Sequence, residues 1–248
     1  MFAAFAPIRY SRLDALRGAA MVWMTLYHFC FDLHYFRWIR QDFYSDPFWT
    51  WQRSLIVTLF LLCTGAGQAI ALHQGQSWQR FGRRWAQIAG CALLVSAGSF
   101  VMYPKSFIYF GVLHAIAIML IVVRLTAHWG AWLWLLGAVA IAMKFIASYA
   151  LNIWPILDFL NSKPWNWLGL ISVKPMTEDY VPLIPWLGIV WWGMAATQYM
   201  LRKQPSQLSG ALPAGTRTLA WMGRWSLLYY MLHQPVMIGL LEVVQRFR

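Results

Sequence analysis

Residues 54–79 read SLIVTLFLLCTGAGQAIALHQGQSWQ and contain no Asp, Glu, Lys or Arg. A helix needs about 20 consecutive apolar residues to cross the hydrocarbon core of a bilayer, so this run is long enough to span a membrane. Similar uncharged runs follow at 85–104, 106–123, 125–143, 180–201 and 225–241. Together with an opening helix at about 15–35, they predict an all-α fold, a polytopic membrane helix bundle of about seven transmembrane helices.

The composition of the chain is that of a membrane protein. Of its 248 residues, 60% are hydrophobic and 11% are charged, and the net charge is +12. A soluble domain carries roughly 25% charged residues, so these figures exclude a soluble, disordered or collagen-like chain. The mean hydropathy of +0.50 and the 17 tryptophans indicate a lipid partner and no nucleic acid. Cys30, Cys63 and Cys91 lie in apolar runs without CxxC spacing, so we expect no metal site.

Charge in the connecting segments predicts the orientation of the bundle. We expect one transmembrane domain over residues 1–248, with spans at about 15–35, 54–73, 85–104, 106–124, 129–149, 182–201 and 221–241. With the N-terminus in the cytoplasm, the inward-facing basic residues are Arg9, Arg12, Arg17, Arg80, Arg83, Arg84, Arg124, Arg202, Lys203, Arg217 and Arg224. Lys and Arg favour the cytoplasmic side of a membrane, so this pattern predicts a cytoplasmic N-terminus.

The longest connection, at about 150–181, is rich in Pro and Trp. Aromatic residues gather where a membrane meets water, so we expect this segment at the outer interface. Two roles stay open for it: aromatic anchoring alone, or a short helix that covers a cavity.

The first span carries ionisable residues that a bilayer normally excludes. Asp14 and Arg17 lie three residues apart at its inner edge, and His28 and Asp32 lie four apart on one helical face. His28 lies about 16 Å further along the axis than Arg17, near or beyond the middle of the bilayer. A neutral imidazole beside a carboxylate suits general-base or nucleophilic catalysis, because the carboxylate fixes the tautomer and stabilises the imidazolium. A hydrogen bond between helices, or a proton path in a carrier, would use the same two residues.

Other polar residues within or near the spans have two interpretations each. His114 and His233 suit either an interhelical hydrogen bond or a place in a site, as a donor or along the acceptor path. Lys144 either extends its long side chain to the interface or belongs to an ion path. His34 lies near the end of the first span.

Three arginines, Arg80, Arg83 and Arg84, stand just before an expected span on the cytoplasmic side. At this spacing their side chains can bind several phosphate oxygens bidentately. Ordinary anchoring at the inner face explains the same residues. The pair Gly65 and Gly67 is too short for a dinucleotide loop and predicts close packing between helices instead.

Five stretches, in order over almost the whole chain, carry a family resemblance. They are RLDALRG (12–18) followed by HFCFDL (28–33), LFLLCTG (59–65), FGVLH (110–114), IPWLG (184–188) and GRWSLLYYMLHQP (223–235). In these stretches the chain resembles the bacterial relatives of heparan-α-glucosaminide N-acetyltransferase. That family is part of a wider group of transmembrane acyltransferases, in which a basic residue precedes a first-helix histidine with ten residues between them, as Arg17 precedes His28. The group also has an Arg-x-x-Arg element at the cytoplasmic face, which Arg80 and Arg83 match.

The resemblance implies a multi-pass acetyltransferase of the bacterial inner membrane. Its co-substrate would be acetyl-CoA, or another acyl-CoA, from the cytoplasm, and its acceptor a hydroxyl or amine of a sugar or glycan on the opposite side. His28 would be the catalytic base or acyl carrier. The histidine proposed for the animal enzyme lies nearer in alignment to His34, so His34 is the alternative catalyst.

We therefore expect a site in which His28 is oriented by Asp32 and the phosphates of acetyl-CoA are bound by basic side chains. The expected phosphate ligands are Arg12, Arg17, Arg80, Arg83 and Arg84. The expected partners are the lipid bilayer, acyl-CoA and a glycan acceptor, and a homodimer is compatible with the sequence. Two alternatives remain: a small-solute or proton-coupled transporter using His28, Asp32 and Lys144, and a non-catalytic member of an envelope complex.

Overall fold

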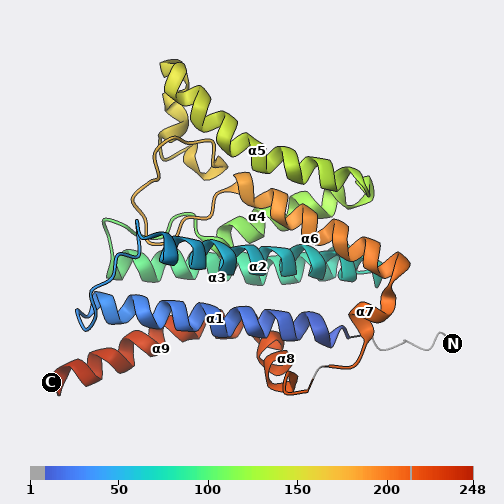
Figure 1. The fold of residues 1–248 in the computed structure, drawn as a ribbon, viewed down its shortest axis with the longest axis horizontal. Coiled ribbons are helices and arrows are strands. Elements are labelled where there is room, and N and C mark those ends of the chain that lie inside the picture. The colour runs from blue at the N-terminus through green and yellow to red at the C-terminus, as the bar shows by residue number, and fades with distance from the viewer. Residues whose placement is uncertain (1–8, 213, 248) are drawn as a thin grey trace. The chain divides into compact units, whose positions relative to one another are not determined.

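The computed structural model describes residues 9–212 and 214–247, and within them every regular element is a helix (Figure 1). The α-helices are α1 (Ser11–Tyr35), α2 (Pro47–His73), α3 (Trp78–Met102), α4 (Val112–Thr126), α5 (Trp132–Ile153), α6 (Leu183–Lys203), α7 (Pro205–Ser209), α8 (Arg217–Arg224) and α9 (Ser226–Arg246). Three short 3-10 helices are η1 (Ala127–Trp129), η2 (Pro155–Asn161) and η3 (Asn166–Leu168). The all-α prediction is confirmed.

Five of the described helices are long and apolar enough to cross a membrane. They are α2, α3, α4 with η1, α5 and α9. Helices α1 and α6 are long enough to cross a membrane but are less apolar. Helix α1 carries charged residues in each half, and α6 is rich in Trp and Gly, whose hydropathy is low. The fold is therefore that of a membrane protein, while the count of seven spans and the cytoplasmic N-terminus stay predictions.

Several helices begin elsewhere than the sequence suggests. Helix α3 begins at Trp78, seven residues before the expected span, because Ser77 caps its N-terminus and its arginines are accommodated within the helix. Helix α4 begins at Val112, not at 106. The preceding segment is held in an irregular path, since the amide of Ile108 donates to Ser99 and its carbonyl accepts from Ser96.

The last expected span is corrected as well. Instead of one helix over 221–241 there are two, α8 and α9, separated at Trp225. Helix α8 ends where Gly223 lies against the backbone of Asp14, and the amide of Trp225 closes the turn on the carbonyl of Met222. The chain then enters α9 in a new direction (Figure 1).

The chain forms two compact units, and the first comprises Met1–Phe60 and Gln204–Arg248. In it α1 packs against both α8 and α9 (Figure 1). Helix α8 can approach α1 closely because Gly18 and Gly223 have no side chain. A Cβ at Gly18 would lie 1.9 Å from the carbonyl oxygen of Leu219, and one at Gly223 would lie 1.8 Å from that of Asp14. Backbone contact at two glycines thus locks α1 to α8.

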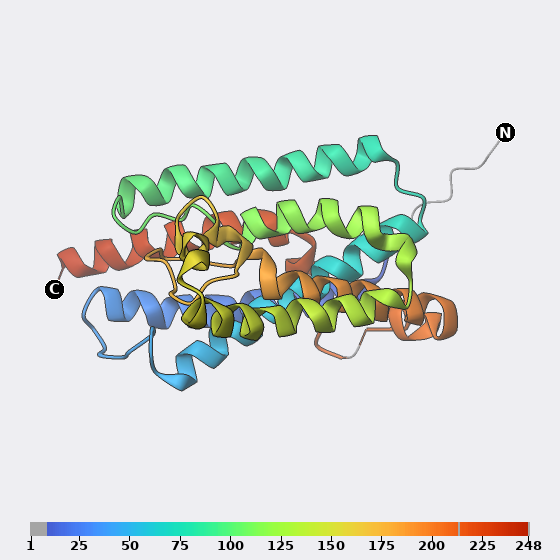
Figure 2. The ribbon, with the colours of Figure 1, turned by 90° about the horizontal axis from the view of Figure 1, so that it is seen from above.

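The second unit comprises Leu61–Lys203. Helices α5 and α6 run side by side in it, as Figure 2 shows from above. A Cβ at Gly65 would lie 2.0 Å from the carbonyl oxygen of Val190, so the prediction that Gly65 serves close helix packing is confirmed. Gly193 approaches the backbone of Leu62 in the same way, which joins α6 to this part of α2.

Candidate functional site

Helices α1 and α9 of the first unit meet along a row of polar side chains. The His28 Nδ1 lies 2.8 Å from the His233 Nε2, and the two rings are stacked with 14° between their planes. One helical turn further along, the Gln234 Nε2 donates to the Asp32 Oδ1 at 2.7 Å. In the other direction, the hydroxyls of Thr25 and Tyr229 lie 2.6 Å apart. The consecutive residues His233 and Gln234 of α9 thus contact His28 and Asp32 of α1, respectively.

The hydrogen bonds of His233 determine which nitrogen of His28 is available for chemistry. The His233 Nδ1 lies 2.7 Å from the carbonyl oxygen of Tyr230, which can only accept, so this nitrogen carries the proton. In a neutral ring the Nε2 is then an acceptor, and the His28 Nδ1 must donate to it. The proton-free nitrogen of a neutral His28 is therefore Nε2, which makes no hydrogen bond to any residue that the structure describes.

Asp32 has a different hydrogen-bond partner from the expected one, since it contacts Gln234 and not His28. Its side chain is 2% exposed, and its described partner is Gln234 through Oδ1. The other oxygen, Oδ2, is buried without a hydrogen-bond partner among the described residues. The group that holds the His28 ring is therefore His233, on α9, and Asp32 bonds to the residue that follows it.

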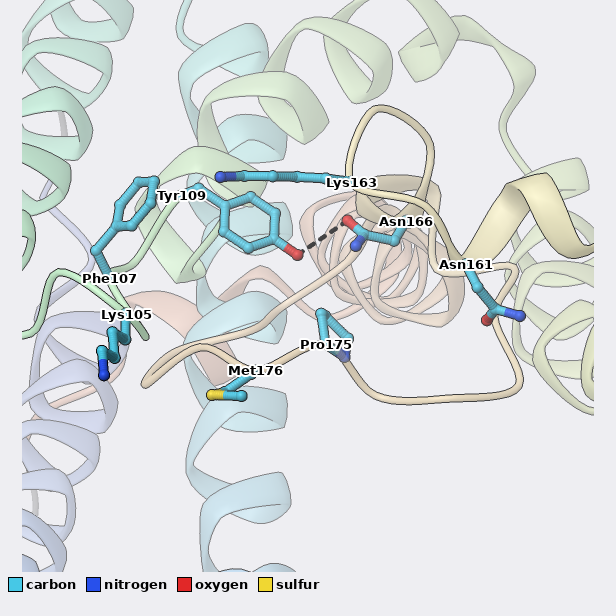
Figure 3. Close-up of a pocket in the computed structure, with 8 residues that line it drawn as sticks. All are labelled: Lys105, Phe107, Tyr109, Asn161, Lys163, Asn166, Pro175 and Met176. Atoms are coloured by element: carbon cyan, nitrogen blue, oxygen red, sulfur yellow. Dashed lines mark hydrogen bonds between the residues drawn. The ribbon is translucent and has the colours of Figure 1, made fainter.

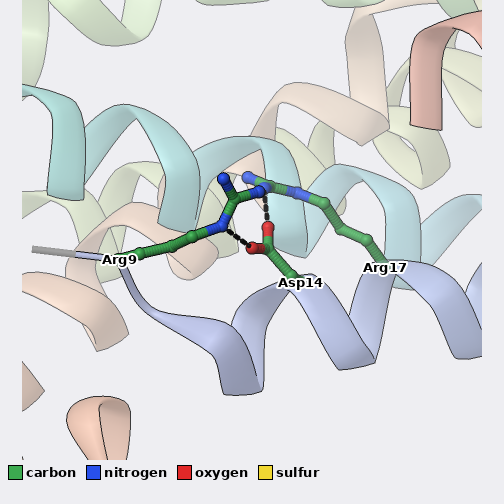
Figure 4. Close-up of polar contacts among 3 residues, drawn as sticks. All are labelled: Arg9, Asp14 and Arg17. Atoms are coloured by element: carbon green, nitrogen blue, oxygen red, sulfur yellow. Dashed lines mark hydrogen bonds and ion pairs between the residues drawn. The ribbon is translucent and has the colours of Figure 1, made fainter. Parts of the chain in front are cut away.

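The first turns of α1 use their charges in contacts within the unit. Asp14 is buried and accepts from Arg9 at 2.8 Å and from Arg17 at 3.3 Å (Figure 4). Arg12 donates to the carbonyl oxygens of Gln207 and Ala211 beside α7. Of the two arginines expected here to bind phosphate, Arg12 therefore holds a neighbouring segment and Arg17 is paired with a carboxylate.

His34, the alternative catalyst, lies in the last turn of α1. Its Nδ1 accepts from the amide of Gln41 at 3.3 Å, in the segment that leads to α2. It thus stabilises a connection, and its ring lies against Phe43.

In the second unit, the exposed side chains of Arg80, Arg83 and Arg84 gather in the first two turns of α3. The dipole of a helix places partial positive charge at this end, which adds to the field of the three arginines. Arg80 also donates to the carbonyl oxygen of Gly75, and Arg84 donates to Gln87. The start of α3 is a basic, solvent-facing surface that suits phosphate groups.

Arg124 supports this surface, a role that the sequence did not reveal. It is 7% exposed and lies at the end of α4, with its guanidinium 4.4 Å from the ring centre of Trp78 and 4.6 Å from that of Phe81. It donates to the side chain and the carbonyl oxygen of Gln76. Arg124, which the sequence predicted only to face the cytoplasm, therefore fixes the loop before α3. Its partners lie more than forty residues earlier in the chain, so the sequence alone carries no signal of this role.

His114 caps a helix. Its Nδ1 accepts from the amide of Gly111 at 3.3 Å. The Ser96 hydroxyl donates to the carbonyl oxygen of Ile108, so the His114 Nε2 donates to Ser96 at 3.0 Å. Both ring nitrogens are thus engaged at the N-terminus of α4, where Asp179 accepts from the amide of Val112.

Lys144 lies on an exposed face of α5 among apolar side chains, with its ammonium 5.9 Å from the ring centre of Phe145. This position suits a side chain that extends toward the membrane interface. No described contact joins it to a polar pathway, so nothing here favours the transporter alternative.

A cavity of about 340 Å³ lies in the second unit between the segments before α4 and α6 (Figure 3). It is lined by Lys105, Phe107, Tyr109, Asn161, Lys163, Asn166, Pro175 and Met176. The ammonium of Lys163 lies 4.6 Å from the ring centre of Phe107 and 5.1 Å from that of Tyr109. The hydroxyl of Tyr109 donates to the buried Asn166, whose backbone carbonyl accepts from Tyr180. The segment at 150–181 thus lines a cavity in addition to presenting aromatic side chains.

Burial raises the pKa of Tyr180, and the neighbouring Tyr109 raises it further. The phenol therefore stays protonated at neutral pH and can donate to Asn166. This bond ties the cavity wall to the segment that leads into α6.

The described residues thus form a helical membrane protein, with paired histidines on facing helices of the first unit and an exposed basic helix start in the second. The comparison with known families identifies it further: residues 9–235 match the model of the heparan-α-glucosaminide N-acetyltransferase catalytic domain. The chain belongs to this family, which confirms the resemblance seen in the sequence. No curated protein and no solved structure matches the chain.

Proposed function

We propose that the protein is a transmembrane acetyltransferase that moves an acetyl group from cytoplasmic acetyl-CoA to a hydroxyl or amine of an extracytoplasmic sugar. The family match supports acetyl transfer, and the five membrane-competent helices support a place in the bilayer. The observation that carries the role of His28 is its hydrogen bond to His233, which leaves the Nε2 of His28 free to accept a proton.

In this mechanism the His28 Nε2 takes the proton of the acceptor hydroxyl or amine as that atom attacks the thioester carbonyl. A new C–O or C–N bond forms, the C–S bond breaks, and the proton on His28 passes to the leaving thiolate. The His28 Nδ1 stays bonded to His233 throughout, so the ring keeps its orientation while charge develops on it. An acyl carrier role uses the same nitrogen, which would first take the acetyl group and then release it to the acceptor.

The phosphates of acetyl-CoA would bind to Arg80, Arg83 and Arg84. These side chains are exposed at the start of α3, where helix dipole and guanidinium charge act together. Arg17 and Arg12 stay candidates only if phosphate replaces their present partners, Asp14 and the carbonyls of Gln207 and Ala211.

The decisive experiment is transfer from labelled acetyl-CoA to a sugar acceptor by purified wild-type protein and by His28→Ala. General-base catalysis contributes about 10²- to 10⁴-fold, so kcat should fall by that factor while the affinity for acetyl-CoA stays the same. His34→Ala is the matched comparison and should retain most of the activity. Normal turnover by His28→Ala would refute the assignment, and loss of turnover in His34→Ala alone would move the catalyst to His34.

A second experiment tests the donor site by binding. Arg80→Ala/Arg83→Ala protein should bind acetyl-CoA at least tenfold more weakly, because each lost charge-assisted hydrogen bond costs about 1.5–3 kcal/mol. Equal affinity for acetyl-CoA and for dephosphorylated pantetheine derivatives in the wild type would show that the phosphates are not recognised.

A further inference from the structure

The contact between Asp32 and Gln234 leaves two buried acceptors unused. The Gln234 amide donates to the Asp32 Oδ1 through Nε2, and the remaining oxygens, Asp32 Oδ2 and Gln234 Oε1, have no hydrogen-bond partner among the described residues. An ionised Asp32 oxygen and an amide oxygen both only accept hydrogen bonds, so neither can satisfy the other. The pair therefore requires donors that the described residues do not supply.

The need to orient His28 does not explain the carboxylate at position 32, because His233 already holds the His28 ring. Joining α1 to α9 does not require a carboxylate, since an amide at position 32 would accept from Gln234 through one oxygen just as well. A carboxylate that is 2% exposed and lacks a cationic partner among the described residues is costly to bury. The buried carboxyl and the two unused oxygens point to a ligand with hydrogen-bond donors.

We propose that Asp32 and Gln234 form the acceptor subsite, and that they bind a sugar through two neighbouring donor groups, either two hydroxyls or a hydroxyl and an amine. Asp32 lies one helical turn from His28, and Gln234 follows His233 directly, so the subsite lies next to the His28–His233 pair. This inference rests on the proposed function and specifies how its acceptor is recognised. It also predicts that an acceptor with a single donor group is a poor substrate.

The test uses Asp32→Asn in the full-length protein, because asparagine keeps the oxygen that Gln234 needs and replaces only the unused one. The probes are acetyl-CoA with D-glucosamine, which has an amine beside hydroxyls, and acetyl-CoA with cyclohexylamine, which has an amine alone. We expect kcat/KM for glucosamine to fall at least about tenfold, while the value for cyclohexylamine changes less than threefold. The dissociation constant of acetyl-CoA should stay the same.

Thermal unfolding without ligand gives a readout independent of turnover. Asp32→Asn should unfold at the same temperature as wild type or higher, because it removes a buried carboxyl that no described cation compensates. Gln245→Ala, on α9 in contact with Trp38, is the matched control and should discriminate between the two amines as wild type does.

Four results would overturn the proposal: unchanged glucosamine transfer by Asp32→Asn, an equal loss for both amines, a lower unfolding temperature, or a wild type that does not prefer glucosamine. Failure of the proposed function looks different. In that case the wild type would neither bind acetyl-CoA nor release CoA with either amine.

Discussion

At the scale of single residues, the chemistry of His28 depends on a chain of two hydrogen bonds. A backbone carbonyl at Tyr230 fixes the proton of His233, and His233 in turn fixes the proton of His28. Each member has one available role, since a carbonyl can only accept and a neutral imidazole has one donor and one acceptor. His233 is thus a positioning residue, acting on the reaction through His28.

This assignment predicts different outcomes for two substitutions of His233. In His233→Gln a side-chain oxygen can still accept from the His28 Nδ1, so kcat should stay within about tenfold of wild type. In His233→Leu no acceptor remains, and kcat should fall about 10²-fold with little change in the KM for acetyl-CoA. Steady-state kinetics on both variants check the prediction, and equal losses in the two would show that His233 only packs against α1.

At the scale of elements, glycines determine how closely α1 and α8 approach. Gly18 and Gly223 each place one helix against the backbone of the other, where a side chain has no room. The same principle joins α2 to α6 in the second unit through Gly65 and Gly193.

We expect Gly223→Ala to destabilise the protein by about 1–3 kcal/mol, because its Cβ would overlap the carbonyl of Asp14. Gly239→Ala is the matched control, since a Cβ at that position would meet no described atom within 4 Å. It should be neutral or stabilising by up to about 1 kcal/mol through helix propensity. Thermal unfolding in detergent measures both, and equal stability of the two variants would contradict the close approach of α1 and α8.

The start of α4 gives a second prediction at this scale. His114→Ala removes a side chain that caps the helix and bonds to Ser96, so we expect a loss of about 0.5–2 kcal/mol in stability. The kcat of the folded fraction should stay near the wild-type value. His128→Ala, on the exposed η1, should leave stability unchanged. A kcat loss in His114→Ala without a fall in unfolding temperature would place His114 in the reaction instead.

At the scale of the whole molecule, the charges of the connecting segments predict the orientation of the chain in the membrane. The distribution of arginines predicts a cytoplasmic N-terminus, with the connection before α6 outside and the connection after α6 inside. The proposed function also requires the arginines at the start of α3 to face the cytoplasm, because acetyl-CoA is made there.

Single cysteines can test this orientation in a variant with Cys30, Cys63 and Cys91 replaced by alanine. We expect Ser162→Cys to react with a membrane-impermeant maleimide in intact cells. Ser209→Cys, which is also exposed in the structure, should react only after the membrane is opened. The reverse pattern would invert the topology, and labelling of both residues in intact cells would contradict an odd number of crossings between them.

The sequence alone predicted the helical class, the membrane environment and the family, because hydropathy and the order of motifs are properties of the linear chain. It also identified His28, Asp32 and His233 as ionisable or polar residues where a bilayer disfavours them. Helix starts were less predictable. Charge ends an uncharged run without ending a helix, as at α3, and the span expected over 221–241 is divided at Trp225 between α8 and α9.

Which of these residues meet was decided only by the tertiary structure. Asp32 lies on the same face of α1 as His28, yet the partner of His28 is His233, about two hundred residues later in the chain. His114, expected either in an interhelical hydrogen bond or in a site, caps a helix, and Arg124, expected only to face the cytoplasm, fixes a loop. Periodicity places side chains on the face of one helix, whereas hydrogen bonds between helices depend on the packing of the two faces, which no single segment encodes.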